Sequence, residues 1–409
     1  MQKILEIAKK NIYVHYKDMT SIKNNISFKS NPIINATSFI EDRILLNKAL
    51  LDGTTDVSVV LNTNNKYERN ERIRRFAVAW GVAFLTPLIT LPLTNRLAMK
   101  YVAKLTPKLS SKNSNLIELS NKFLKDKCAI KEGIEKLSKD KKTDYSDIIK
   151  KCDGDYEKLR RKLVDAKMSV LSFDFLFTSA TLGSIGFINR FITRKKTGRS
   201  GFSAEFNMAD KASVEQRAEK YKKTEKLRNA IFIPSVILLG LLPLIIRKGL
   251  NSKGKTADFI KKYADKFDYN DGIFMKRLPF LLMTLVADIG IILSSRNKTE
   301  VKDNAVRLSA SQAAFFGGDI IIGSTLAVLS DRIFKTQLLD KECNKNWINK
   351  IIPPIKPIRN LKGKDKAIAA GLFWVNMCAL FTIMGVGIPK MLNKMIKKDV
   401  DKDVKSSKT

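Results

Sequence analysis

Three aspartates stand inside long apolar runs of the sequence, where a charged side chain is least expected. They are Asp174, Asp288 and Asp319, and each belongs to a different run. A carboxylate near the centre of a bilayer costs about 2.5 kcal/mol or more, so such a residue faces a protein interior or water. Buried carboxylates of this kind exchange protons or hold cations. We therefore take the three aspartates as candidates for a shared ion or proton site.

Small and polar residues share the predicted helical face of each aspartate. Thr178 follows Asp174 by four residues, and Gly323 follows Asp319 by four residues. This spacing turns the acids toward other helices rather than toward lipid. A second interpretation is that each acid is hydrated at a membrane boundary or pairs privately with a nearby arginine, namely Arg190, Arg296 or Arg332.

The segment 249–256, GLNSKGKT, matches the Walker A pattern letter by letter. In a true P-loop, Lys255 would contact the β- and γ-phosphates and Thr256 would hold magnesium. A P-loop also needs a short buried strand in front of it, whereas a run of apolar residues containing Pro234 and Pro243 precedes this segment. We therefore interpret the match as accidental and treat nucleotide hydrolysis as a remote alternative.

Long uncharged runs predict the helices that must position these residues. Each run has the length of a helix that crosses a hydrocarbon core of about 30 Å, and each is bracketed by Lys or Arg. They predict an all-α, polytopic membrane bundle with about six spans, over 76–94, 168–188, 230–246, 278–295, 308–330 and 367–388. Gly317, Gly318 and Gly323 give the fifth of these a face that another helix can approach closely.

Two segments flank the predicted bundle of residues 75–392, and a third lies within it as a loop outside the bilayer. Residues 1–74 form a polar region with one short amphipathic helix, which Ser38 and Glu41 begin as a capping box and Asp52-Gly53 ends. Residues 97–167 carry apolar residues at steps of three and four, which predicts a helical hairpin outside the bilayer. Residues 393–409 form a basic tail.

The charge balance is strongly basic, with 75 Lys and Arg against 40 Asp and Glu and a net charge of +35. A basic residue near anionic lipid contributes about 1 kcal/mol of attraction, so the loops flanking the spans explain the excess and no nucleic acid is expected. An even number of spans places both termini on one side. We expect the cell membrane as location and cytoplasmic termini, because arginines precede the first run and the tail is basic.

The residues that most enzymes use are scarce in this chain. His15 is the only histidine, which argues against Ser-His-Asp and Cys-His catalysis and against histidine-rich metal sites. The four cysteines, Cys128, Cys152, Cys343 and Cys378, have no zinc or haem spacing and are expected to be free thiols. The sequence therefore predicts a protein that is not an enzyme and holds no metal or cofactor.

Three functional hypotheses follow from these patterns. The leading one is a transporter or permease-like bundle that uses the intramembrane aspartates. The second is a non-catalytic membrane scaffold whose basic loops bind anionic lipid and whose 97–167 hairpin binds a partner protein. The third is a membrane-bound nucleotide hydrolase built on the Walker match. They differ in which residues must be indispensable: the buried acids, the loop cations, or Lys255 with Thr256.

Overall fold

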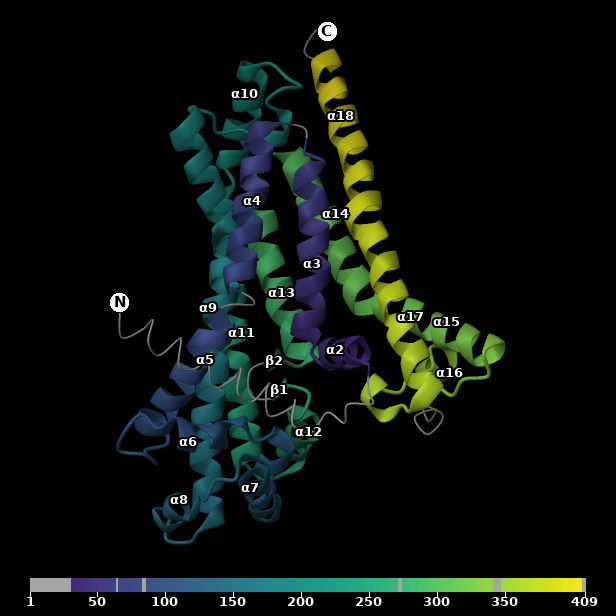
Figure 1. Ribbon diagram of the computed structural model, residues 1–409. Coiled ribbons are helices and arrows are strands. Elements are labelled where there is room, and N and C mark those ends of the chain that lie inside the picture. The colour runs from purple at the N-terminus through teal and green to yellow at the C-terminus, as the bar shows by residue number, and fades with distance from the viewer. Residues whose placement is uncertain (1–30, 64, 83–85, 271–273, 341–346, 407–409) are drawn as a thin grey trace. The chain divides into compact units, whose positions relative to one another are not determined.

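The computed structural model has an all-α fold (Figure 1), and it describes residues 31–63, 65–82, 86–270, 274–340 and 347–406. The chain divides into two compact units. The first unit contains the described residues of 81–182 and 230–287, and the second contains the described residues of 26–80, 183–229 and 288–409. His15 and Cys343 lie outside the described residues, and the other three cysteines are free thiols.

The first unit is built mostly from short helices followed by parts of longer ones. α7 shows how the local sequence begins and ends such a helix: the Asp126 side chain accepts the N–H groups of Cys128 and Ala129, and Lys142 ends the helix in a left-handed conformation. The elements are α5 (Thr86–Leu97), η2 (Ala98–Val102), α6 (Ser111–Ser114), η3 (Asn115–Glu118), η4 (Asn121–Leu124), α7 (Lys127–Lys141), α8 (Ser146–Lys150), the start of α9 (Tyr156–Thr197), most of α11 (Glu225–Asn251), α12 (Lys255–Ala264), the antiparallel pair β1 (Tyr269–Asn270) and β2 (Phe274–Met275), and the start of α13 (Arg277–Leu293).

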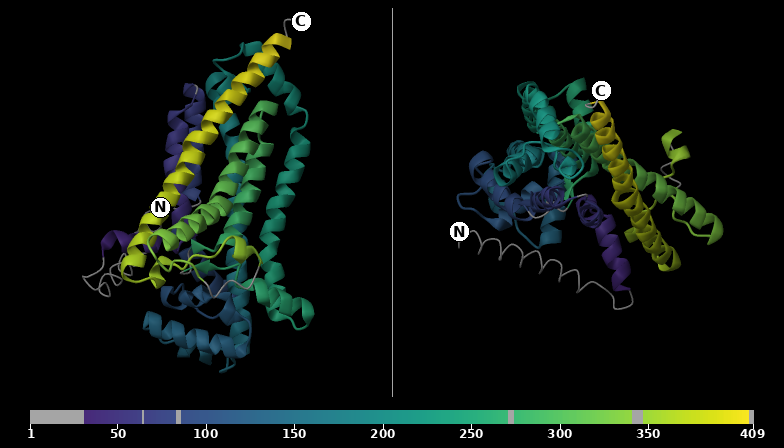
Figure 2. Two further views of the ribbon diagram at one scale, coloured as in Figure 1. Left: turned by 90° about the vertical axis from the view of Figure 1, so that its right-hand side faces the viewer. Right: turned by 90° about the horizontal axis from the view of Figure 1, so that it is seen from above.

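The second unit is a bundle of longer helices. In both views of Figure 2, α18 runs beside α14, and the two helices are in contact. The elements are α2 (Pro32–Glu41), α3 (Ile44–Leu61), α4 (Lys66–Trp80), η5 (Ser203–Glu205), α10 (Lys211–Lys222), α14 (Lys298–Gln312), η6 (Ala313–Gly318), α15 (Asp319–Ile333), α16 (Trp347–Ile351), η8 (Ile358–Asn360), α17 (Gly363–Phe381), η9 (Thr382–Gly387) and α18 (Ile388–Ser406), with the remaining parts of α9, α11 and α13.

Four helices of the described chain are long and apolar enough to cross a membrane, rather than six. They cover Tyr156–Thr197, Ala230–Asn251, Lys298–Ile333 and Gly363–Asp401. The third and fourth are continuous because the π-helical turns η6 and η9 join their two α-helical parts. These four helices suggest a membrane location for the protein.

The two remaining runs are where the predicted count of six is wrong. The run 278–295 forms α13, whose 17 residues extend about 25 Å, which is short of a hydrocarbon core of about 30 Å. The run 76–94 is shared between α4 and α5, and α5 contains Pro92 in its interior. The number of uncharged residues gives the length of an apolar run but not the residue at which a helix ends. The helical length of these two runs is therefore shorter than predicted.

Much of the apolar surface of the four long helices faces outward. Between 22% and 39% of each apolar window is buried inside the protein. The side chains of Leu238 and Ile233 on α11 and of Val375 on α17 are each more than half exposed. Contiguous apolar surface of this extent is rare in contact with water, and it suits contact with lipid.

This outward apolar surface predicts how the protein behaves on extraction. We expect it to remain in the membrane pellet after washing with alkaline carbonate or with high salt, and to dissolve only in detergent, because apolar contact with lipid is not screened by salt. Immunoblots of pellet and supernatant after each wash are the measurement. Release by salt alone would mean that charge holds the protein on the membrane surface, and it would contradict the assignment of spans.

The N-terminal helix begins and ends at other residues than the predicted ones. α2 starts after Asn31, whose side chain accepts the Ile33 N–H, whereas Ser38 is buried inside the helix. The Glu41 carboxylate accepts the N–H of Ile358, 2.8 Å away, instead of closing a capping box. The chain continues as α3, which runs through Gly53. The ring of Trp80 packs where a Cβ of residue 53 would stand, at 2.7 Å, which explains why a glycine is placed inside this helix.

Candidate functional site

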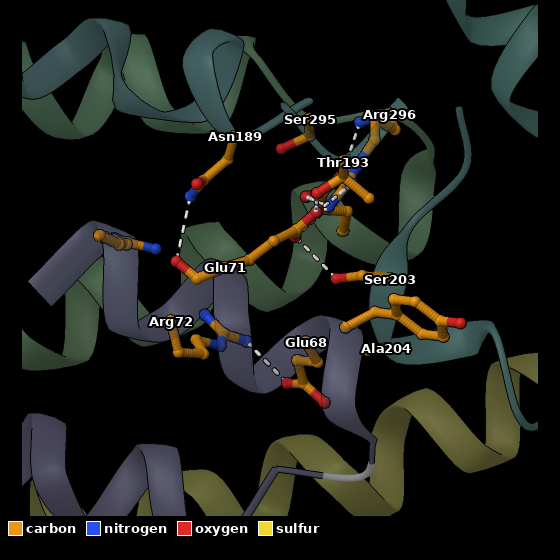
Figure 3. A network of polar contacts seen from close by, with 12 residues as sticks. Glu68, Glu71, Arg72, Asn189, Thr193, Ser203, Ala204, Ser295 and Arg296 are labelled. Atoms are coloured by element: carbon orange, nitrogen blue, oxygen red, sulfur yellow. Dashed lines mark hydrogen bonds and ion pairs between the residues drawn. The ribbon is translucent and has the colours of Figure 1, made fainter. Parts of the chain in front are cut away.

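A buried network of polar and charged side chains joins four segments of the second unit (Figure 3). Glu71 projects from α4, Thr193 from the end of α9, Ser203 from η5, and Arg296 from the segment before α14. All four residues are buried. Thr193 and Arg296 follow the apolar runs 168–188 and 278–295, and Glu71 precedes the run 76–94, so the network ties together the polar ends of apolar runs.

The centre of the network is a two-pronged ion pair. Arg296 donates from Nη1 to Glu71 Oε1 at 2.9 Å and from Nη2 to Glu71 Oε2 at 2.8 Å. The Ser203 hydroxyl donates to Glu71 Oε2 at 2.7 Å, and the Thr193 hydroxyl donates to Glu71 Oε1. Both carboxylate oxygens therefore accept two hydrogen bonds each, which is the saturation that a buried carboxylate requires.

Arg296 bridges two carboxylates rather than one. Its Nε donates to Glu300 Oε2 at 2.9 Å, and its Nη2 donates to Glu300 Oε1 at 2.7 Å. Burial alone would raise the pKa of Glu71, but the charge and hydrogen bonds of Arg296 outweigh burial and hold the pKa below its ordinary value. Burial would lower the pKa of Arg296, but Glu300 and Glu71 outweigh it and keep the pKa well above the ordinary value. Glu71 and Arg296 are thus charged at neutral pH, and Arg296 joins Glu71 and Glu300 into one clamp.

A second charged cluster lies beside this clamp. Asp303 on α14 accepts hydrogen bonds from Arg72 at 2.9 Å and from Arg307 at 2.8 Å, and Arg72 also contacts Glu68 at 3.3 Å. A cavity of about 40 Å³ between the two clusters is lined by residues of both, including Glu71 and Asp303. Such a volume suits one or a few solvent molecules rather than a substrate.

Charged residues also run along one face of α3. Lys48, Asp52 and Asp56 follow one another at steps of four, which places them on a single face of the helix. Lys48 is buried, its Nζ lies 2.6 Å from Asp52 Oδ1, and it stands over the ring of Phe315 at 5.0 Å. We call these three residues the α3 stripe.

The α3 stripe lies close to one of the predicted aspartates. Asp288 is near enough to Lys48 and Asp52 for their charges to interact, and Arg75 of α4 interacts with both Asp56 and Asp288. Asp288 Oδ2 accepts a hydrogen bond of 2.6 Å from Gln312 Nε2 on α14. Two cations and three carboxylates from α3, α4 and α13 are thus gathered in one part of the second unit.

The stripe lies alongside one of the four long apolar helices. The hydroxyl of Ser58 on α3 donates to the carbonyl of Gly385 at 2.6 Å, and α3 contacts both α17 and η9. Gly385 belongs to the apolar run 367–388, so the stripe stands level with residues of a candidate span rather than beyond them. Charged side chains at such a level are costly unless they serve a function or are fully paired.

The other two predicted aspartates have neutral partners of their own. Asp319 Oδ1 accepts from Asn376 Nδ2 at 2.9 Å in the second unit. Asp174, in the first unit, accepts from Tyr269 Oη at 2.9 Å and from Thr178 at 3.2 Å. Within the described part of the chain, no hydrogen bond or ion pair joins any two of the three aspartates.

One of the predicted arginine partners pairs with other acids. Arg296 is engaged by Glu71 and Glu300.

Two residues of the predicted packing face have near neighbours: a Cβ at Gly323 would lie 3.2 Å from Ile355, and one at Gly318 would lie 3.4 Å from Leu380. Gly317 has no atom of this kind within 4 Å.

Sequence reasoning missed the α3 stripe, although a signal for it exists. Ending the predicted helix at Asp52-Gly53 excluded Asp56 and hid the four-residue spacing of the charges. The clamp was missed for another reason. Glu71 and Arg296 are 225 positions apart, and no local pattern links them. Only the tertiary fold shows that they meet.

The Walker A match lies in helical surroundings. Gly249 is part of α11, and a Cβ there would come within 2.4 Å of Ile260, so this glycine permits close packing against α12. Lys255 and Thr256 begin α12 and are exposed. The element in front is a 27-residue helix instead of the strand that a P-loop requires. These surroundings do not support a phosphate-binding loop.

Comparison with known proteins adds no identity to this geometry. No family model matches the chain, and no curated protein or solved structure matches it significantly. Among the described residues, no group of three or more His, Cys, Asp or Glu side chains is placed to hold a metal ion. Function therefore has to be argued from the charged residues and the apolar helices themselves.

Proposed function

We propose that the protein is a multi-pass membrane transporter of permease type, in which the second unit provides a path for protons or small cations. The observation that carries this proposal is the α3 stripe, which places Lys48, Asp52 and Asp56 alongside an apolar run and close to Asp288. Ionisable residues at membrane level are rare and mark ion or proton paths by default.

The chemistry of the stripe suits proton or cation transfer. Lys48 and Arg75 interact electrostatically with the nearby carboxylates of Asp52, Asp56 and Asp288. Nearby cations favour the charged form of a carboxylate, whereas burial favours the neutral form, so the two opposing effects allow a carboxylate to change its charge at modest cost. This differs from the clamp at Glu71, where every carboxylate oxygen is saturated.

The proposal includes an orientation in the membrane. Four spans, being an even number, place both termini on one side, and we assign that side to the cytoplasm of the cell because the C-terminal tail is basic. Basic loops next to the spans would then face the anionic lipid of the cytoplasmic leaflet.

Proton flux in reconstituted vesicles tests the proposal. Purified protein in liposomes with a trapped pH-sensitive dye is expected to dissipate an imposed pH gradient faster than protein-free liposomes. Asp288→Asn should return the rate to that of protein-free liposomes, because an amide keeps the shape of the side chain but does not exchange the proton. Asp56→Asn is expected to act in the same direction. Asp140→Asn, on the exposed face of α7, is the matched control and should keep the wild-type rate.

Two outcomes would contradict the proposal. The first is a wild-type rate equal to that of empty liposomes, measured with both protons and potassium. The second is a pair of stripe variants that are stable and fully active. Either result would favour the second candidate, a membrane scaffold that binds anionic lipid through basic loops and a partner protein through the 97–167 region. One observation favours that candidate, namely a cationic pocket beside α9 and α10.

A further inference from the structure

A pocket of about 330 Å³ in the second unit is lined by more cations than acids. The end of α9, the helix α10 and the start of α11 form its walls. Five of its lining residues are basic and two are acidic, and the basic ones are Arg190, Arg194, Lys222, Arg228 and Arg296. The pocket is separate from the α3 stripe, so it is not explained by the proposed transport path.

Buried arginines hold the base of this pocket in place. Arg228 donates from Nη1 to the carbonyl of Leu293 at 2.9 Å and from Nη2 to the carbonyl of Tyr221 at 3.0 Å. Its guanidinium also lies over the Tyr221 ring at 4.2 Å. Arg296 is held by the clamp described above. Arg228 and Arg296 therefore hold the walls of the pocket in place. The other basic lining residues, Arg190, Arg194 and Lys222, form its rim.

Two of the rim cations, Arg194 and Lys222, lack counter-ions among the described residues. Arg194 and Lys222 are exposed and make no ion pair in the part of the chain that the structure describes. Of the two acids, Glu215 accepts the N–H groups of Ser200 and Gly201, with the nearest contact at 2.8 Å, and so is occupied with holding the loop. Glu219 is exposed. The rim thus keeps an excess of positive charge.

The pocket stands where apolar helix surface gives way to polar residues. Arg190 and Arg194 directly follow the apolar run 168–188 of α9. Phe191, which lines the pocket, and Leu227, which precedes the lining residue Arg228 in the chain, each expose more than two thirds of their surface. A cationic hollow edged by exposed apolar side chains at this level matches the two parts of a lipid, a charged headgroup and its acyl chains.

We propose that this pocket binds the phosphodiester headgroup of an anionic phospholipid, with Arg194 and Lys222 contacting the phosphate and Phe191 lying against the acyl chains. The field of Arg228 and Arg296 below adds to the attraction. Neutral phosphatidylcholine also carries a phosphate, but its choline cation would face the same positive rim, so the pocket should prefer phosphatidylglycerol.

Native mass spectrometry of the detergent-purified full chain tests this site. The wild type is expected to retain added phosphatidylglycerol in preference to phosphatidylcholine. The double variant Arg194→Gln/Lys222→Gln should bind phosphatidylglycerol about 30-fold more weakly, since each basic residue contributes about 1 kcal/mol. The double variant Lys195→Gln/Lys223→Gln changes two exposed neighbours outside the pocket and has the same net charge, so it is the matched control and should change binding less than about threefold.

Further measurements distinguish a lipid headgroup from a soluble anion, and a loss of binding from a loss of folding. Glycerol 3-phosphate and inorganic phosphate are added as soluble competitors, and neither should displace the lipid at concentrations where phosphatidylglycerol binds. Displacement by either one would assign the pocket to a soluble anion and overturn the proposal. Equal losses in the two double variants would overturn it as well. The thermal unfolding temperature of each variant is measured in parallel, and if the pocket double variant unfolds, Lys222→Gln alone is used.

Discussion

Replacing Arg296 by methionine is expected to lower the free energy of unfolding by about 3–5 kcal/mol, because the change leaves two buried carboxylates, Glu71 and Glu300, without their shared cation. Glu71→Gln should cost less, since Arg296 then keeps Glu300 as a partner. Arg296→Lys should not restore stability, because one ammonium group cannot make paired contacts to two carboxylates at once. Thermal or denaturant unfolding in detergent measures all three variants.

The same variants should differ in the direction of their pH dependence. In the wild type the pKa of Glu71 is lowered, so its stabilising contribution is present above the unfolded value of about 4.3 and is lost as the pH falls through the folded value. In Arg296→Met, Glu71 loses the cation that outweighs burial, so burial raises the pKa of Glu71 and protonation favours the folded state. The variant should therefore become more stable as the pH falls from 7 to 5, whereas the wild type should not.

A double variant provides the control for this interpretation. Glu71→Gln added to Arg296→Met removes one of the two stranded charges, so it should recover part of the lost stability. If the single variants and the double variant are strictly additive, Arg296 and Glu71 do not depend on each other, and the description of the clamp as one unit is wrong.

The second large effect is expected at a buried pair in the first unit. Lys167 on α9 and Asp268 are both almost fully buried, and Lys167 donates to Asp268 and to the carbonyl of Leu119. Asp268 also accepts the N–H of Asn121 at 2.8 Å and the N–H of Tyr269 at 2.9 Å. One carboxylate therefore links α9, η4 and β1.

Lys167→Met should lower the free energy of unfolding by about 3 kcal/mol, because it leaves the buried Asp268 carboxylate with only the more distant Lys276 ammonium, 3.9 Å away, as a cation. Replacing both members, as Lys167→Met/Asp268→Leu, is not expected to restore stability, since the two backbone N–H groups then lose their acceptor. The measurement is again unfolding of the detergent-solubilised protein. Full recovery in the double variant would show that Asp268 serves Lys167 alone.

An exposed pair at the start of the same helix, between Lys158 of α9 and Asp153 just before it, is the matched control for this prediction. Lys158 Nζ lies 2.7 Å from Asp153 Oδ2, a distance as short as that of a buried pair, but both side chains are largely in solvent. Lys158→Met is therefore expected to leave the unfolding transition unchanged, because solvent screens the interaction. A loss as large as that of Lys167→Met would mean that burial is not the cause of the difference.

The sequence by itself was sufficient to predict an all-α fold and the cores of the four long apolar helices. Their apolar windows contain few charges. In apolar surroundings such a run forms a helix, because a helix pairs its own backbone N–H and C=O groups. The sequence also predicted that a long apolar run instead of a short strand precedes Gly249 of the Walker match, and that segment is helical.

Tertiary structure alone decided where helices end and which charges meet. The helix formed by the run 278–295 ends at Leu293, and α3 continues through Gly53, against which Trp80 packs. Local composition predicts neither of these features. Periodicity reports the face on which a residue lies, but a partner hundreds of positions away becomes a neighbour only through packing. For this reason Asp288 could be singled out from the sequence, whereas its neighbour Arg75 and the clamp of Glu71 with Arg296 could not.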